Sequence, residues 1–228
     1  MSLRIFSIRP EPGLSTTIKT GAEMGLPIIG MPLAQIAPRG WTMPALDDID
    51  GLLIGSANAI RHAGEKLEAL KELPVLAVGS KTAELARESG FRVEMIGSGG
   101  LQQLIDMLDP SKERHLLRLA GHAHVELNIP DHINLTTRIV YHVEHTDIAA
   151  EKAGLIDQEC TILLHSAGAA LHLVQETERL GIDRSKITLV TLGPRISESA
   201  GTGWAEVYTA SNPDERTLLA LARDMCQD

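Results

Sequence analysis

Small hydroxyl-bearing side chains follow several short apolar runs of this sequence. Ser56, Ser80, Thr82 and Ser166 stand just after such runs, and a Gly193-Pro194 turn follows another. Short, bounded apolar runs are typical of buried parallel strands. Ligands of open parallel sheets bind outside the carboxyl ends of the strands, where helix N-termini present free N–H groups and partial positive charge. The pattern predicts an anion-binding site, with the alternative that these side chains only cap helices.

Tyr141 is a second candidate for chemistry. It is one of only two tyrosines and lies in a stretch that reads as a linker. A phenol keeps its proton at neutral pH and can donate a hydrogen bond to a leaving oxygen. The alternative is a half-buried strand tyrosine.

Other chemistries are disfavoured. No G-x-G-x-x-G follows a strand and no P-loop pattern occurs, so neither a dinucleotide nor a nucleoside triphosphate is expected; the glycine-rich stretch 97–100 reads as a turn. The histidines at 122, 124, 142 and 145 lack metal-ligand spacing, so we expect no metal site. Ser56 and Ser166 lack a G-x-S-x-G elbow, which argues against a serine hydrolase.

Two segments of the chain recur. Residues 52–60 reappear as 162–170, an offset of 110, and residues 74–83 reappear as 187–196, with their glycines 114 apart. A near-constant offset across two motifs indicates an internal duplication. The sequence therefore predicts two copies of one α/β unit, with residues 136–143 matching the stretch around 31–33.

The composition excludes several partners. The 228 residues carry a formal charge of −9 and only 3% aromatic residues. The negative charge and the small number of aromatic residues argue against nucleic acid and anionic membranes as binding partners. No apolar run reaches bilayer-spanning length and the N-terminus lacks a signal-peptide pattern, so we expect a cytoplasmic protein. The isolated Cys160 and Cys226 suggest neither a zinc site nor a disulfide.

Ten strand signals alternate with helical stretches, which is typical of doubly wound parallel sheets. Strands are expected at residues 3–8, 27–31, 52–55, 75–78, 92–96, 116–120, 136–143, 161–164, 188–192 and 206–209, with helices including 57–70, 81–88 and 101–108. Linker-like regions near 32–40 and 138–145 permit two partitions of the chain. One cuts it once near residue 113, and the other inserts residues 38–138 between 1–33 and 146–228.

A set of short motifs in a fixed order resembles the uroporphyrinogen-III synthase family. The motifs are Arg9-Pro10, Pro32-Leu33, Ser56-Ala57-Asn58-Ala59, Val78-Gly79-Ser80-Lys81-Thr82-Ala83, Gly90-Phe91, Val140-Tyr141, Ser166-Ala167 and Leu192-Gly193-Pro194. The resemblance implies the crossed partition: two flavodoxin-like lobes, 1–33 plus 146–228 and 38–138, joined by a two-stranded linker at about 34–37 and 139–145. It places the active cleft between the lobes.

The family's reaction is cofactor-free. Hydroxymethylbilane loses water from its terminal hydroxymethyl group, and ring D attacks through a spiro intermediate, inverts and closes to uroporphyrinogen III. The resemblance implies a monomer that takes its substrate from hydroxymethylbilane synthase. It also implies that Tyr141 assists hydroxyl loss, while the substrate is bound by Arg9, Ser56, Ala57, Ser80, Thr82, Ser166, Gly193, Arg195 and Ser197.

The sequence departs from the family pattern at two places. Arg195-Ile196 stands where many members have a threonine after Gly-Pro, so Arg195 or Ser197 is expected to replace that hydroxyl. Ala120-Gly121-His122 stands where members often have Arg-Gly. Two other functions stay open: a non-catalytic module that binds a tetrapyrrole or other polyanion, and, more remotely, a flavin protein.

Overall fold

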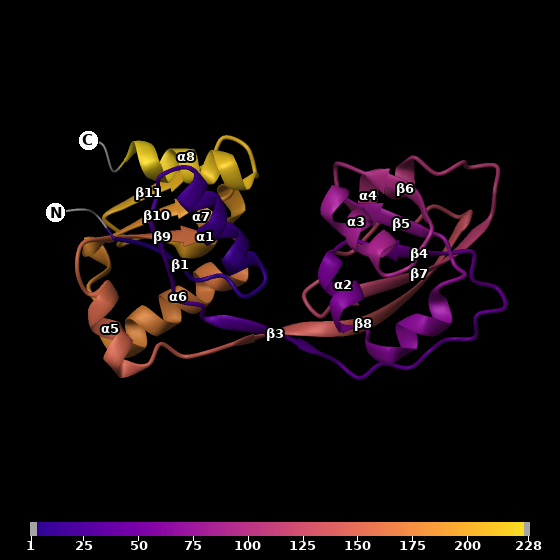
Figure 1. Ribbon diagram of the computed structural model, residues 1–228, viewed down its shortest axis with the longest axis horizontal. Coiled ribbons are helices and arrows are strands. Elements are labelled where there is room, and N and C mark those ends of the chain that lie inside the picture. The colour runs from indigo at the N-terminus through magenta and orange to yellow at the C-terminus, as the bar shows by residue number, and fades with distance from the viewer. Residues whose placement is uncertain (1–3, 226–228) are drawn as a thin grey trace. The chain divides into compact units, whose positions relative to one another are not determined.

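The computed structural model describes residues 4–225, which form two compact units (Figure 1). The first unit combines the chain up to Gln35 with the chain from Glu144 onward, and the second is Ile36–Val143. Each unit has a sheet whose central strands run parallel, together with helices, so the predicted α/β fold class is confirmed.

The first unit has a five-stranded parallel sheet of order β11-β10-β9-β1-β2. Alternate residues of its central strands face opposite ways. Phe6 and Ile162 pack against Leu173 on one face, while Leu163 packs against Leu218 on the other. The elements are β1 (Arg4–Ser7), α1 (Gly13–Glu23), β2 (Ile28–Gly30), α5 (Ala150–Ile156), β9 (Cys160–Leu164), α6 (Ala167–Leu180), a 3₁₀ turn (Arg184–Lys186), β10 (Ile187–Thr191), α7 (Pro194–Ala200), β11 (Glu206–Thr209) and α8 (Glu215–Asp224).

The second unit has a six-stranded sheet of order β3-β8-β7-β4-β5-β6. Leu52 and Leu117 pack with Ala83 on one face of the sheet, and Leu53 and Leu116 pack with Leu104 on the other. The elements are β3 (Ala34–Pro38), β4 (Gly51–Ile54), α2 (Ala57–His62), a 3₁₀ helix (Gly64–Leu70), β5 (Val75–Val78), α3 (Ser80–Glu88), β6 (Val93–Gly97), α4 (Leu101–Asp106), β7 (Arg114–Gly121) and β8 (Ile133–His145).

The two sheets share one spatial order that the chain traces differently. The order β2-β1-β9-β10-β11 in the first unit corresponds to β8-β7-β4-β5-β6 in the second. The registers agree as well, because the pair Leu52–Val75 corresponds to Ile162–Leu189 at the two offsets of the sequence repeat. The strands that begin the first unit have their counterparts at the end of the second, so the units are circular permutations of one another. The first unit has the flavodoxin-like order.

The two-stranded linker that the resemblance implies is present, because β3 lies beside β8 in the sheet. The strand signals of the sequence did not include β3, which is an eleventh strand. One local prediction is wrong. The single helix expected over 57–70 is broken: α2 ends at His62, and Gly64, with φ +73°, starts a 3₁₀ segment. A left-handed φ cannot continue an α-helix, and glycine adopts it without steric cost.

Helices do begin directly after the strands. The Ser56 hydroxyl accepts a hydrogen bond from the Asn58 N–H and the Ser166 hydroxyl accepts one from Ala169, each at 3.2 Å. Both serines therefore cap helices, as the capping alternative predicted. At α3 the cap is Gly79, with φ +78°, and Ser80 is the first helical residue.

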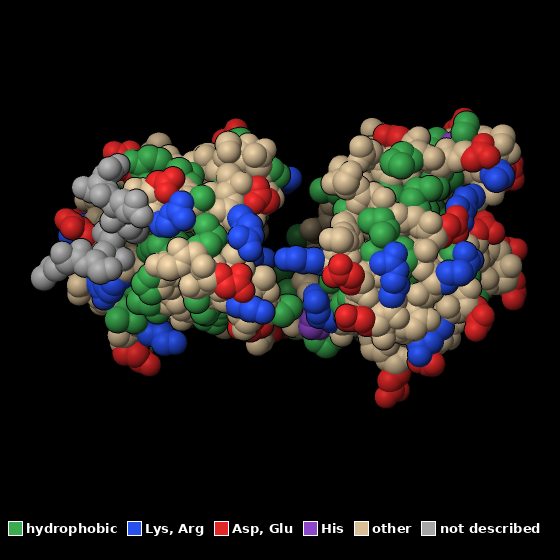
Figure 2. Space-filling model, turned by 45° about the horizontal axis from the view of Figure 1, so that its top comes forward, with side chains coloured by type: hydrophobic (Ala, Val, Ile, Leu, Met, Phe, Trp, Pro, Cys, Tyr) green, Lys and Arg blue, Asp and Glu red, His purple; other side chains and the backbone are tan. Residues whose placement is uncertain are grey.

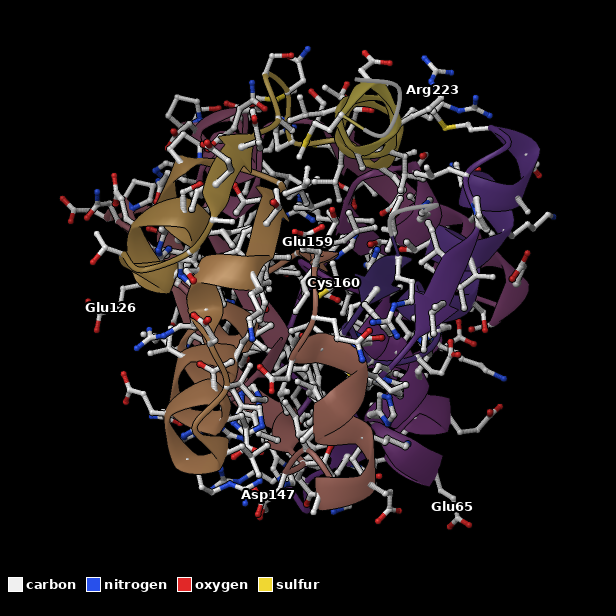
Figure 3. All side chains as sticks on the ribbon, turned by 90° about the vertical axis from the view of Figure 1, so that its left-hand side faces the viewer. Glu65, Glu126, Asp147, Glu159, Cys160 and Arg223 are labelled. Atoms are coloured by element: carbon white, nitrogen blue, oxygen red, sulfur yellow. The ribbon has the colours of Figure 1, made fainter. Side chains whose placement is uncertain are left out.

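The face of the surface in Figure 2 carries side chains of both charges, and the thiol of Cys160 is buried. On the face shown in Figure 2, acidic and basic side chains are interspersed over both units. No described helix is long and apolar enough to span a bilayer. Cys160 is buried inside the first unit (Figure 3), and this burial raises the pKa of its thiol to about 11. Cys226 lies outside the described residues.

Candidate active site

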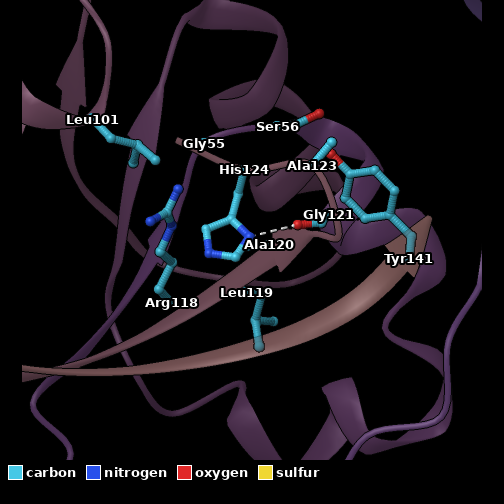
Figure 4. A pocket seen from close by; sticks show the side chains of 10 residues that line it. All are labelled: Gly55, Ser56, Leu101, Arg118, Leu119, Ala120, Gly121, Ala123, His124 and Tyr141. Carbon is cyan, nitrogen blue, oxygen red and sulfur yellow. Dashed lines mark hydrogen bonds between the residues drawn. The ribbon is translucent and has the colours of Figure 1, made fainter. Parts of the chain in front are cut away.

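A cavity of about 140 Å³ lies at the carboxyl ends of β4 and β7 in the second unit (Figure 4). The chain runs outward from β4 through β5 to β6, and then returns to β7 and β8 on the other side. Such a reversal point is where open parallel sheets bind ligands. The cavity is lined by residues that include Gly55, Ser56, Arg118, Gly121, His124 and Tyr141.

Tyr141 is half-buried on β8, beside the end of β7. Its backbone carbonyl accepts a 2.9 Å hydrogen bond from the His122 N–H. The ring lies against Gly121, where no side chain intervenes: a Cβ there would be 2.9 Å from the tyrosine hydroxyl oxygen. The bare glycine therefore lets the phenol reach the cavity that Ser56 also lines.

His124 is exposed and lies on the rim of the cavity. Its Nδ1 is 2.9 Å from the Gly121 carbonyl oxygen (Figure 4). A carbonyl only accepts, so the ring proton of the neutral histidine is assigned to Nδ1, and Nε2 is left as an acceptor.

Arg118 supplies the positive charge of the cavity. It is only 4% exposed, and its Nη1 donates to the Val125 carbonyl at 2.9 Å. Burial lowers the pKa of this guanidinium, although an arginine remains protonated near neutral pH.

A larger hollow of about 670 Å³ lies on the same unit and shares His124 with the first cavity. Arg39 lies on it with its Nη1 3.2 Å from Nδ1 of His122, and Arg138 donates to the Thr42 carbonyl at 2.9 Å. Neither arginine forms an ion pair with a carboxylate within the part of the chain that the structure describes.

Arg9, a predicted binding residue, is held inside the first unit. Its Nη1 donates to Glu215 at 2.8 Å and to the Thr17 hydroxyl at 3.2 Å. His165, directly after β9, lies with Nε2 3.2 Å from the other Glu215 oxygen. Burial alone would raise the pKa of Glu215, but hydrogen bonds from His165 and Thr17 and the charge of Arg9 outweigh it and hold the pKa at about 2.

The turn after β10 leads into α7, which carries Arg195 and Ser197, the two residues expected to replace the family's threonine. Gly193 is the N-cap of α7, and Arg195 is exposed on its first turn. The Ser197 hydroxyl instead lies 2.6 Å from that of Thr191 and 2.7 Å from that of Thr209, within a hydroxyl cluster.

The predicted site residues are not gathered in one place within either unit. Ser56 and Tyr141 share the second unit's cavity, whereas Ser80 and Thr82 do not line it. Thr82 is only 5% exposed on α3, and Ala57 is the first residue of α2. Ser166, Gly193, Arg195 and Ser197 lie at the strand ends of the first unit.

Sequence reasoning missed Arg118 and gave His124 no role. The available signal was a charge in the middle of the apolar run Leu116-Leu117-Arg118-Leu119-Ala120. Fully buried arginines are rare unless they are paired. Over residues 4–225, no cluster of three or more His, Cys, Asp or Glu side chains could hold a metal ion.

Comparison with known proteins adds to this geometry. Residues 15–220 match the family described as uroporphyrinogen-III synthase HemD. The chain belongs to the uroporphyrinogen-III synthase family. The resemblance identified from the sequence motifs is thereby confirmed, and with it the family's function in heme biosynthesis.

Solved structures of uroporphyrinogen-III synthases share the fold. The synthetase from Helicobacter pylori 26695 matches with a TM-score of 0.67 at 15% identity, covering 98% of this chain and 99% of that one. A mutant enzyme from the extremely thermophilic bacterium Thermus thermophilus matches with a TM-score of 0.52 at 11% identity, covering 99% and 100%. No curated protein matches this sequence.

Proposed function

We propose that this chain converts hydroxymethylbilane to uroporphyrinogen III without a cofactor, and that the second unit's cavity forms part of its active site. The observation that carries this assignment is the seating of Tyr141 against Gly121, which brings a phenol to a cavity containing a guanidinium. A hydrogen-bond donor and a cation are what the departure of a hydroxyl group and the binding of carboxylates require.

In this proposal Tyr141 donates a hydrogen bond to the terminal hydroxyl of the substrate. The C–O bond breaks, the pyrrole nitrogen stabilises the resulting cation, and the departing hydroxide takes up a proton to become water. Ring D loses one proton from its unsubstituted α-carbon at closure, so the net change is the loss of one water, which makes the enzyme a hydro-lyase. Ring D then attacks as the carbon nucleophile, and its inversion precedes closure. The protein contributes mainly by holding the bilane in the geometry that favours this attack over direct closure.

The other binding residues proposed are Arg9, Ser56, Ala57, Ser80, Thr82, Ser166, Gly193, Arg195 and Ser197. Of these, exposed Arg195 is better placed than Ser197 to meet a carboxylate, because the Ser197 hydroxyl is bonded to two threonines. We also propose that the protein works as a cytoplasmic monomer and receives its unstable substrate from hydroxymethylbilane synthase.

The test is a coupled assay. The protein is given freshly generated hydroxymethylbilane, the products are oxidised, and the type I and type III isomers are separated by chromatography. Protein-dependent type III product is expected. Type I product alone, formed at the uncatalysed rate, would refute the enzyme and favour the non-catalytic polyanion-binding module.

A further inference from the structure

Arg118 is a buried cation without a counter-ion. Its Nε is fully buried and has no hydrogen-bond partner among residues 4–225, and within that range its side chain bonds only to the neutral Val125 carbonyl. No carboxylate of the described chain forms an ion pair with it. Burying a charge and a donor in this way opposes folding, because neither recovers the water it has lost.

Arg114, on the same strand, is an arginine that has a structural role. It precedes Arg118 by four residues on β7 and therefore lies on the same face of the sheet. Its guanidinium donates to both oxygens of Glu94, at 2.8 and 3.3 Å. One strand thus carries an ion-paired arginine at its beginning and, four residues further along, a more deeply buried arginine that has no ion pair within residues 4–225.

The fold itself does not need an arginine at position 118. Arg118 pairs in register with Leu53, and Leu53 corresponds to Leu163 in the sequence repeat. In the first unit Leu163 pairs with Ser7, so the equivalent position there holds a small side chain. The same sheet is therefore built without a guanidinium at this place.

The surroundings of Arg118 favour an anion. The cavity lining includes the Ser56 and Tyr141 hydroxyls and, among the residues that the structure describes, no Asp or Glu side chain. One water molecule needs about 10–15 Å³ of such a cavity, so a volume of about 140 Å³ has ample room for a carboxylate arm.

We infer that Arg118 anchors one acetate or propionate arm of the ligand in this cavity, its unpaired Nε–H donating to a carboxylate oxygen. A planar guanidinium pairs well with a carboxylate, and the bound anion would supply the missing partner. This inference rests on the proposed function for the identity of the ligand, but the carboxylate site itself can be tested without any turnover.

The first experiment is a titration of the ¹⁵N-labelled full-length protein with sodium acetate and with sodium propionate, followed by NMR. We expect saturable shifts of the Arg118 Nε–H signal and of the Ser56 and Tyr141 amides. Acetamide and propionamide, which lack the charge, should need at least about tenfold higher concentrations for half-saturation, because hydrogen bonds between charged groups are stronger than those to neutral groups. Arg118→Met should abolish saturation at the two amides, whereas the matched Arg114→Met should retain it. Non-saturable shifts, or equal responses in Arg118→Met and wild type, would overturn the inference.

The second experiment separates binding from a structural role. Since Arg118 has no counter-ion, Arg118→Met is expected to unfold at the same temperature as wild type or higher, whereas Arg114→Met, which breaks an ion pair, should unfold lower. In the coupled assay Arg118→Met should lower kcat/KM by about 10- to 100-fold, chiefly through KM. Loss of stability in Arg118→Met with unchanged KM would mark a structural arginine. If wild type forms no type III product while acetate still saturates the cavity, the proposed function fails and the carboxylate site stands.

Discussion

A Cβ built on Gly121 would lie 2.6 Å from Cζ of Tyr141, well inside the ordinary separation of two carbon atoms. The ring is therefore seated on bare backbone at the point where β7 and β8 leave regular register. This contact links the loop that departs from the family pattern to the proposed catalytic tyrosine.

Gly121→Ala is expected to displace the Tyr141 ring and to reduce type III formation by about tenfold or more, because small misplacements of a reacting group lower rates steeply. Gly154→Ala is the matched control, since nothing lies within 4 Å of that position and it lies within α5. The control should gain about 0.5–1 kcal/mol of stability and keep its activity. Equal activity of both variants in the coupled assay would show that the packing of the Tyr141 ring on Gly121 does not affect turnover.

Tyr141→Phe should lower kcat by about 10²-fold, since it removes the donor to the leaving hydroxyl while keeping the ring in place. Its thermal unfolding should stay close to that of wild type, as the ring still packs on Gly121. Tyr208, the other tyrosine, is exposed on β11, and Tyr208→Phe serves as the control variant. Near-normal turnover by a folded Tyr141→Phe protein would remove the catalytic role without removing the family assignment.

Ser56 and Ser166 allow capping and binding to be separated. Replacing either with alanine should cost about 1 kcal/mol of stability, because each hydroxyl caps a helix. Ser56→Gly should restore most of that stability, since glycine is a tolerable N-cap. If the Ser56 hydroxyl also contacts substrate, the glycine variant will show a raised KM at near-normal unfolding temperature. An unchanged KM would leave Ser56 with the capping role alone.

The His165–Glu215 pair predicts how stability depends on pH. Burial lowers the pKa of His165 below 6.5, so on acidification the unfolded chain takes up a proton before the folded chain does. Unfolding is then favoured as pH falls from 7 to 5, and His165→Gln should flatten this slope. The pH dependence that remains in His165→Gln is expected to come from His62 and His145, whose pKa values burial also lowers.

Glu215 acts in a different pH window. Its folded-state pKa of about 2 lies below the ordinary 4.5, so its stabilisation is complete above 4.5 and is lost as pH falls towards 2. It therefore adds little to the slope between pH 5 and 7. Urea unfolding of wild type and His165→Gln at pH 5, 6 and 7 measures the effect, and parallel pH dependence in the two proteins would contradict it.

Local sequence signals were enough to predict the α/β class, ten of the eleven described strands, the internal repeat and the family. Buried parallel strands need short apolar runs, and the helices after them need capping residues such as Ser56 and Ser166, so both leave a mark on the sequence. Tyr141 could also be singled out, since its residue type and place in the chain are visible without coordinates.

Which of these residues meet became clear only from the folded chain. β3 exists because a neighbouring strand supplies its hydrogen bonds, and no local pattern records that pairing. Arg9 is held by Glu215, which lies 206 residues away in the chain, and Arg118 is conspicuous only because no carboxylate of the described chain reaches it. Contacts between distant segments, and their absence, depend on how the sheet is assembled, so the chemistry of the cavity could not be predicted from the sequence alone.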